Sequence, residues 1–134
     1  MRSTRIVTSF IKDNDKFLLL KRSNKVKTMK GLWAGVSGVI EKNEEPLKRA
    51  KTEIYEELGI PEDKIKFLKA ASKIMVHSPQ YENHEWEIFP FLFEVENPVI
   101  KLNWENSDYK WITVNEIGSY ETVPSIEKVL LSLL

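Results

Sequence analysis

The segment from Pro46 to Gly59 constrains the fold most, because the sequence marks both of its ends and one of its faces. Proline suits the first turn of a helix, and a glycine followed closely by Pro61 is typical of a helix end. At about 100° per residue, a helix over 46–58 gathers its apolar side chains on one narrow stripe. The stripe contains Leu47, Ala50, Ile54 and Leu58. We therefore expect this helix to pack against a β-sheet.

Most of the other apolar runs favour strands. Residues 5–12 and 16–22 flank the turn sequence of residues 13–15, so they predict a β-hairpin, and the polar run 23–31 predicts a loop. Further strands are expected over 32–40, where Gly35 and Gly38 make the backbone irregular, and over 65–76, 86–95 and 109–113. A short helical turn is expected over 114–119, and a final helix over 125–133.

The strand expected over 86–95 is apolar on both faces, which is typical of a strand buried between two layers. The alternating side chains are Phe89, Phe91, Phe93 and Val95 on one face and Ile88 and Leu92 on the other. Pro90 lies within this run and cannot donate a ladder hydrogen bond. It therefore predicts a sheet edge or a bulge at that point.

Length and composition indicate one globular domain over residues 1–134. The chain is 42% hydrophobic and 30% charged, with no apolar run long enough to span a membrane and no signal segment at its start. We therefore expect a cytoplasmic protein with no membrane partner. The absence of cysteine excludes disulfides, thiolate metal sites and a cysteine nucleophile.

Charge is balanced overall, with 20 basic and 20 acidic residues, but the basic residues gather early in the chain. Residues 16–30 contain six lysines and arginines and no acid. Such a stretch suits an anionic ligand, although a solvated loop has the same composition. A nucleic-acid partner is not expected, because such proteins more often carry net positive charge across the domain.

The predicted helix carries Glu53, Glu56 and Glu57 beside its apolar stripe. Glu53 is the i,i+3 and i,i+4 neighbour of the other two, and each such like-charged pair costs about 0.2–0.5 kcal/mol. An acidic helix face is often simply solvated, but a divalent cation would remove this repulsion. Because the ligands on offer are carboxylate oxygens, Mg²⁺ or Mn²⁺ is the expected ion.

The wider spacing favours the metal site over the solvated face. Five residues separate Gly38 from Glu44, and the segment then continues through Glu53, Glu56, Glu57, Gly59 and Ile60. These 23 residues, 38–60, resemble the Nudix box, Gly-x5-Glu-x7-Arg-Glu-aliphatic-x-Glu-Glu-x-Gly-aliphatic. Every fixed position matches except Thr52, where the family has arginine. Residues 18–22 and Trp33 also look like the strand and tryptophan that usually precede the box.

The resemblance to the Nudix, or MutT-like, hydrolase family implies an α/β/α sandwich with a mixed β-sheet. It also implies a Mg²⁺-dependent pyrophosphohydrolase, with Mn²⁺ as the alternative ion, in which water attacks phosphorus in a nucleoside tri- or diphosphate derivative. The metal site implied by the family pattern contains Gly38, Glu44, Glu53, Glu56 and Glu57. Glu53 would be a ligand or the general base, Gly38 would offer its carbonyl, and Glu44 would support the loop or an outer metal.

Two further residues are expected to take part in catalysis. Threonine cannot supply the bidentate cationic fork of the family's arginine, but Arg49 lies four residues before Glu53 and could substitute for it. An ordinary surface pairing between Arg49 and Glu53 is the alternative. Glu105 is the expected additional base or metal ligand, because it falls in a predicted loop before a Trp-containing strand, where family members place a late acidic residue.

Substrate contacts are expected in the loops around 23–31 and 77–85. The residues proposed for phosphate contact or base stacking are Lys27, Lys30, Trp33 and Tyr81. Arg22 is expected to be structural, at the end of its strand. The resemblance ranks nucleoside or pterin triphosphates above ADP-ribose and dinucleoside polyphosphates. Dimers are common in the family, so a homodimer is the expected assembly if the chain self-associates.

Thr52 also supports a second hypothesis, a nucleotide-binding or regulatory module that holds its ligand without cleaving it. The isomerase branch of the superfamily is excluded, because it resembles a pattern with a catalytic cysteine and this chain has none.

Overall fold

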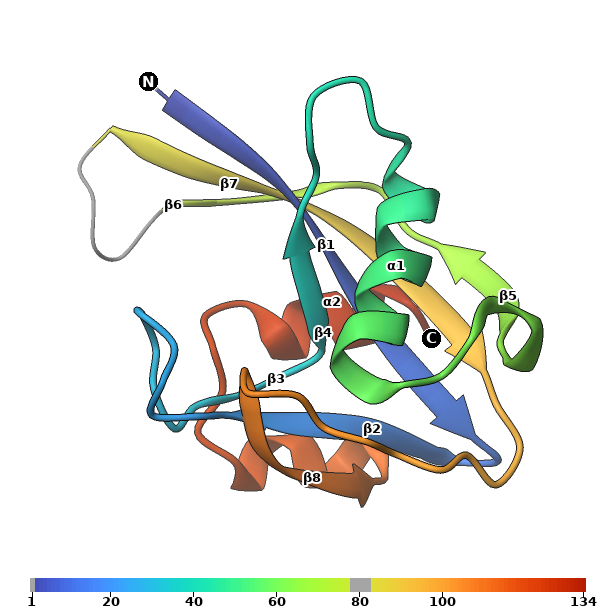
Figure 1. Ribbon diagram of the computed structural model, residues 1–134. Helices are drawn as coiled ribbons and strands as arrows, with labels where there is room; N and C mark the ends of the chain where they lie inside the picture. The colour runs from blue at the N-terminus through green and yellow to red at the C-terminus, as the bar shows by residue number, and fades with distance from the viewer. Residues whose placement is uncertain (1, 78–82) are drawn as a thin grey trace.

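The computed structural model describes residues 2–77 and 83–134, which form a mixed eight-stranded sheet with helices on both faces (Figure 1). The strands are β1 (Arg2–Asp13), β2 (Lys16–Arg22), β3 (Trp33–Ala34), β4 (Val36–Val39), β5 (Lys66–Ala70), β6 (Ile74–His77), β7 (His84–Glu94) and β8 (Asn106–Ile112). The helices are α1 (Pro46–Leu58) and α2 (Ile126–Ser132), with 3₁₀ turns η1 (Glu62–Lys64) and η2 (Val114–Ser119).

The parallel pair β1 and β7 forms the centre of the sheet, from Arg2 opposite His84 to Lys12 opposite Glu94. On its other edge, β1 changes partner along its length. Residues 6–9 pair with β4, and the last two residues pair with β2 as the predicted hairpin. The hairpin turn places Asn14 at a φ of 56°, a conformation that asparagine tolerates well. This arrangement places β4 beside the middle of β1.

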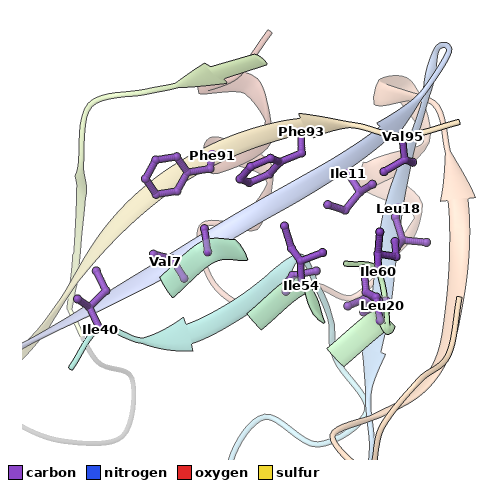
Figure 2. Close-up of a cluster of buried hydrophobic side chains, with 13 residues drawn as sticks. Val7, Ile11, Leu18, Leu20, Ile40, Ile54, Ile60, Phe91, Phe93 and Val95 are labelled. Carbon is purple, nitrogen blue, oxygen red and sulfur yellow. The ribbon is translucent and has the colours of Figure 1, made fainter. Parts of the chain in front are cut away.

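Two apolar cores lie on opposite faces of the sheet, which confirms the predicted α/β/α layering. The first lies under α1 and includes Val7, Ile11, Leu18, Leu20, Ile54, Phe91 and Phe93. The second lies under α2 and η2 and includes Phe10, Phe17, Leu19, Leu92, Val129 and Leu130. Successive residues of β1, β2 and β7 alternate between the two cores, because strand side chains point to opposite faces in turn. Figure 2 shows Ile54 of α1 facing the side chains that β1 and β2 contribute.

The helix α1 begins and ends where the sequence predicts. Pro46 is its first residue, and Gly59 closes it in the left-handed conformation at a φ of 73°, with its N–H donated to Tyr55 O at 2.9 Å. Ala50, Ile54 and Leu58 of the predicted stripe are fully buried. The stripe therefore faces the core as expected.

Pro90 was expected to mark a sheet edge or a bulge. The edge is wrong, because β7 is an interior strand, and its register with β1 continues through Pro90 without a bulge. One edge of β7 pairs with β1, while the other pairs with β5 near its end and with β6 near its start. Pro90 O accepts the N–H of Ala71 at 3.2 Å, and Ala71 lies in the gap between β5 and β6. The N and O atoms of a strand residue point to the same edge, so the missing donor falls where no regular ladder needs it.

Two predicted strands are each divided in the structure. The run 65–76 forms β5 and β6, which are separated by residues 71–73 opposite Pro90. The run 32–40 forms β3 and β4, which separate at Gly35, where an added Cβ would lie 2.8 Å from Ser9 O. The predicted short turn over 114–119 is confirmed as η2, and the final helix spans Ile126–Ser132.

Replacing Ile54 by alanine tests the contribution of the α1 core. Ile54 is fully buried, so the substitution leaves a cavity and should lower the free energy of unfolding by about 2–5 kcal/mol. The neighbouring side chain of Tyr55 is 59% exposed, so Tyr55→Ala is the matched control and should change stability much less. Chemical denaturation measures both, and equal losses would contradict this assignment of the core.

Candidate metal and catalytic site

Gly38 of β4 lies directly against the carboxylate of Glu53 on α1. A Cβ atom built on Gly38 would overlap the end of the Glu53 side chain. Any residue other than glycine would therefore displace that carboxylate. The close approach explains why a glycine stands at this point of the box, and it places a backbone segment of β4 beside the acidic face of α1.

Three carboxylates converge beside Gly38. Glu53, Glu57 and Glu105 each offer one oxygen, and these oxygens all lie within 4.8 Å of one another. Glu53 and Glu57 are buried, at 8% and 4% exposure, and Glu105 is half-buried. Glu56 is exposed on the same helix and is not part of this triad. The helix thus supplies two of the three carboxylates, and the segment before β8 supplies the third.

Hydrogen bonds hold the segment 103–106 in place. The Asn103 side chain donates to Glu105 Oε1 and accepts the Glu105 N–H, both at 3.0 Å. The Asn106 amide donates to Glu57 Oε1, also at 3.0 Å. Ser23 adds two anchors, because its N–H donates to Glu105 O at 2.8 Å and its hydroxyl donates to Trp104 O at 2.7 Å. Asn103 and Asn106 were missed by sequence reasoning, since no periodicity or spacing distinguishes them from loop asparagines.

Burial disfavours the charged form of the two carboxylates that α1 contributes to the triad. Burial raises the pKa of Glu57 well above its ordinary value, and the neighbouring Glu105 raises it further while Asn106 opposes the shift. Burial also raises the pKa of Glu53, against the effect of Arg49. Within the described residues, no nitrogen or hydroxyl donor contacts the buried Glu57 Oε2, although the carboxyl groups of Glu53 and Glu57 lie close enough to share a proton. Buried carboxylate oxygens without partners are suitable ligands for a hard divalent cation.

Arg49 connects two acidic residues at the edge of the triad. Its guanidinium forms a bidentate pair with Glu44, with Nε to Oε1 at 2.9 Å and Nη2 to Oε2 at 2.7 Å. Its Nη1 donates to Glu53 Oε2 at 2.9 Å. Glu44 Oε1 also accepts the N–H of Glu41 at 2.8 Å, which closes the loop before α1. Thr52 instead lines a hollow with Leu47, Lys48 and Tyr55 on another face of α1.

A pocket of about 220 Å³ has Gly38 in its lining. Its walls are mostly apolar and include Ile6, Val39, Val76, Trp86, Ile88 and Ile126, with the hydroxyls of Thr8 and Ser37 among the polar groups. Arg22 lies between this pocket and the triad: it lines the pocket and interacts electrostatically with Glu57 and Glu105. A larger hollow of about 640 Å³, bordered by Gly59 and Val99, contains none of the triad residues.

The comparisons with known proteins identify the family. A family model described as "NUDIX domain" matches residues 2–133. The chain belongs to the NUDIX family. It is 28% identical to a dihydroneopterin triphosphate diphosphatase of Haemophilus influenzae, over 96% of this chain and 87% of that protein. With this membership the chain is a hydrolase that acts on phosphoanhydride bonds.

Solved structures of NUDIX proteins share the fold. A MutT protein from Methanosarcina mazei superposes with a TM-score of 0.76 at 22% identity, covering 97% of this chain and 91% of that one. The NUDIX domain of Shewanella oneidensis NrtR, solved with ADP ribose, gives 0.75 at 14% identity, covering 98% and 86%. At these identities the likeness supports the mixed sheet and its two helical layers.

Of the remaining residues of the site prediction, Lys27, Lys30 and Trp33 are described, and none of them belongs to the triad or lines the pocket. Lys27 and Lys30 are exposed in the loop after β2. Trp33 is half-buried and packs edge to face on Tyr120, with 5.2 Å between ring centroids. Tyr81 lies outside the described residues. Arg22 has the expected structural role, because its Nε and Nη2 donate to Thr28 O at 3.2 and 3.0 Å.

No helix within the described ranges is both long and apolar enough to cross a membrane.

The raised pKa values of Glu53 and Glu57 predict a pH dependence for the metal-free protein. The folded state binds protons that the unfolded chain releases, so stability should fall as the pH rises above 4.5, the ordinary pKa, through the raised values. Thermal unfolding between pH 5 and pH 8 in a chelator measures this. Glu57→Gln should flatten the fall of stability with pH, and Mg²⁺ added in excess of the chelator should offset the loss of stability. An unchanged pH dependence in Glu57→Gln would contradict the raised pKa of Glu57.

Proposed function

We propose that this chain is a Mg²⁺-dependent NUDIX pyrophosphohydrolase, with Mn²⁺ as the alternative ion, that cleaves a nucleoside triphosphate or a similar triphosphate by attack of water on phosphorus. One observation carries the proposal: Gly38 lies against a carboxylate triad, two of whose members are buried, and also lines a mostly apolar pocket. The triad would bind the cation that the anionic phosphates of the substrate need. The apolar pocket would hold its ring.

The residues fit the cation on physical grounds. Glu53, Glu57 and Glu105 would hold it, with the carbonyl of Gly38 and the exposed Glu56 as further oxygen ligands and Glu44 supporting the loop. When bound, such an ion neutralises charge on the phosphate oxygens and lowers the pKa of water. Glu53 or Glu105 would accept a proton from the attacking water or orient it. Arg22 is placed to offer positive charge between the triad and the pocket.

The pocket supports a substrate with one ring system. Its volume of about 220 Å³ is below the roughly 300 Å³ at the lower end of pockets for drug-sized ligands, which favours a single ring system as its occupant. The Haemophilus influenzae relative is named for a triphosphate that carries one such ring system. We therefore rank triphosphates of nucleosides or pterins above ADP-ribose and dinucleoside polyphosphates.

The remaining expectations stay within this proposal. Lys27 and Lys30 would contact phosphate from the loop after β2. Trp33 and Tyr81 stay predicted ring contacts, although Trp33 is not in the lining of the apolar pocket. We also propose a single domain over residues 1–134, a cytoplasmic location, no nucleic-acid partner and a homodimer.

A second candidate function is a nucleotide-binding module that does not cleave its ligand. Two observations favour it: Thr52 replaces the arginine of the family pattern, and the NrtR NUDIX domain was solved holding ADP ribose. The Arg49 geometry argues for the enzyme, because a guanidinium still reaches Glu53.

A hydrolysis panel tests the proposed function. The compounds are ordinary and oxidised nucleoside triphosphates, pterin triphosphate, ADP-ribose, NADH and dinucleoside polyphosphates, each with Mg²⁺ and then Mn²⁺. We expect metal-dependent release of a monophosphate and pyrophosphate from a triphosphate, and loss of this turnover in Glu57→Gln. Tight nucleotide binding without turnover across the panel would instead support the binding module.

Substitution of Arg49 tests whether it replaces the family's arginine. Arg49→Ala should lower kcat about 10- to 100-fold, the usual cost of removing a group that orients a metal ligand. Lys48 is its exposed neighbour on α1, so Lys48→Ala is the matched control. Adding Thr52→Arg to Arg49→Ala should restore part of the turnover if the two positions are interchangeable. Unchanged kcat in Arg49→Ala would refute the role.

A further inference from the structure

Glu57 is held by an uncharged side chain. The amide of Asn106 donates to Glu57 Oε1 at 3.0 Å, and both residues are buried, at 7% and 4% exposure. The other oxygen, Glu57 Oε2, is buried and has no donor among the residues that the structure describes. One oxygen is therefore fixed by Asn106, and the second is left for another partner.

The chemistry of this donor matters for a cation site. An arginine or lysine beside Glu57 would neutralise its charge and repel an incoming cation. An amide has no net charge, so it restricts the orientation of the carboxylate without neutralising it through a direct contact; the positive charge of Arg22 acts on Glu57 electrostatically. Arg49 shows the contrast, because its guanidinium contacts Glu53 and Glu44 at the opposite edge of the acidic group.

Asn106 is itself held firmly. It is the first residue of β8 and lies opposite Arg22 of β2 in the sheet register. The Glu105 carbonyl just before it accepts the N–H of Ser23 at 2.8 Å. Asn103 holds the Glu105 carboxylate in the same way, with an amide donated to Oε1 at 3.0 Å. Residues 103–106 thus provide a donor amide to two of the three carboxylates of the triad.

We propose that Asn106 is a positioning residue for the divalent cation: it fixes Glu57 Oε1 and so presents Oε2 to the ion without adding a competing charge. The proposal rests on the proposed function, because it assumes that the triad binds a cation. It assigns a role to a residue that lies outside the Nudix box and carries no charge.

Binding of Mn²⁺ to the full chain, without substrate, tests this role. The variants are Asn106→Leu, which removes the amide at similar size, and Asn115→Leu, a matched control at an exposed asparagine of η2. Electron paramagnetic resonance measures free Mn²⁺ and gives the Kd. We expect Asn106→Leu to raise the Kd about 10- to 100-fold and to lower kcat with little change in substrate KM. The control should retain the wild-type Kd.

Three further outcomes are informative. A variant that melts at a lower temperature but binds Mn²⁺ with the wild-type Kd would show a merely structural Asn106 and overturn the proposal. If Asn106→Leu fails to fold, Asn106→Ala is measured in the same way and is expected to give the same rise in Kd. If the wild type binds no Mn²⁺ at all, the proposed function fails first, which separates that failure from the failure of this inference.

Discussion

The rest of the site depends on the burial of two carboxylates beside the apolar stripe of α1. Ile54 and Leu58 are fully buried in the core under this helix, and Glu53 and Glu57 precede them directly in the chain. Packing of the apolar stripe therefore carries both carboxylates inward. Their raised pKa values show that burial disfavours their charge. The hydrophobic core thus holds in place an acidic pair that a divalent cation can relieve.

The two buried carboxylates have hydrogen-bond donors of different charge. At one edge of the triad Arg49 pairs with Glu44 and Glu53, so positive charge is already present there. At the other edge Glu57 is held by the neutral amide of Asn106. Around Glu57 the positive charge comes only from the electrostatic interaction with Arg22, and no donor within the described chain contacts its second oxygen. This asymmetry indicates where a cation would gain most.

Part of the fold could be predicted because local chemistry and tertiary packing agree. The ends of α1, the hairpin of β1 and β2 and the two-faced strand β7 all follow from residue type and periodicity. Pro90 was misinterpreted, since a missing N–H predicts an edge only when both neighbours of the strand are continuous. Here the strand that pairs with this edge of β7 is divided into β5 and β6, and the residues around Pro90 do not reveal that division.

The sequence alone determined the family resemblance, the helix α1 and the glutamates on its face, because their spacing along one helix is a local property. It also pointed to Arg49, since an i,i+4 neighbour of Glu53 lies on the same side of the helix. Only the tertiary structure decided that Glu105 joins Glu53 and Glu57 while Glu56 stays exposed, and that Asn106 reaches Glu57. Those contacts join residues about 50 positions apart, and the pairing of β8 with β2 sets them, which no local pattern in the sequence records.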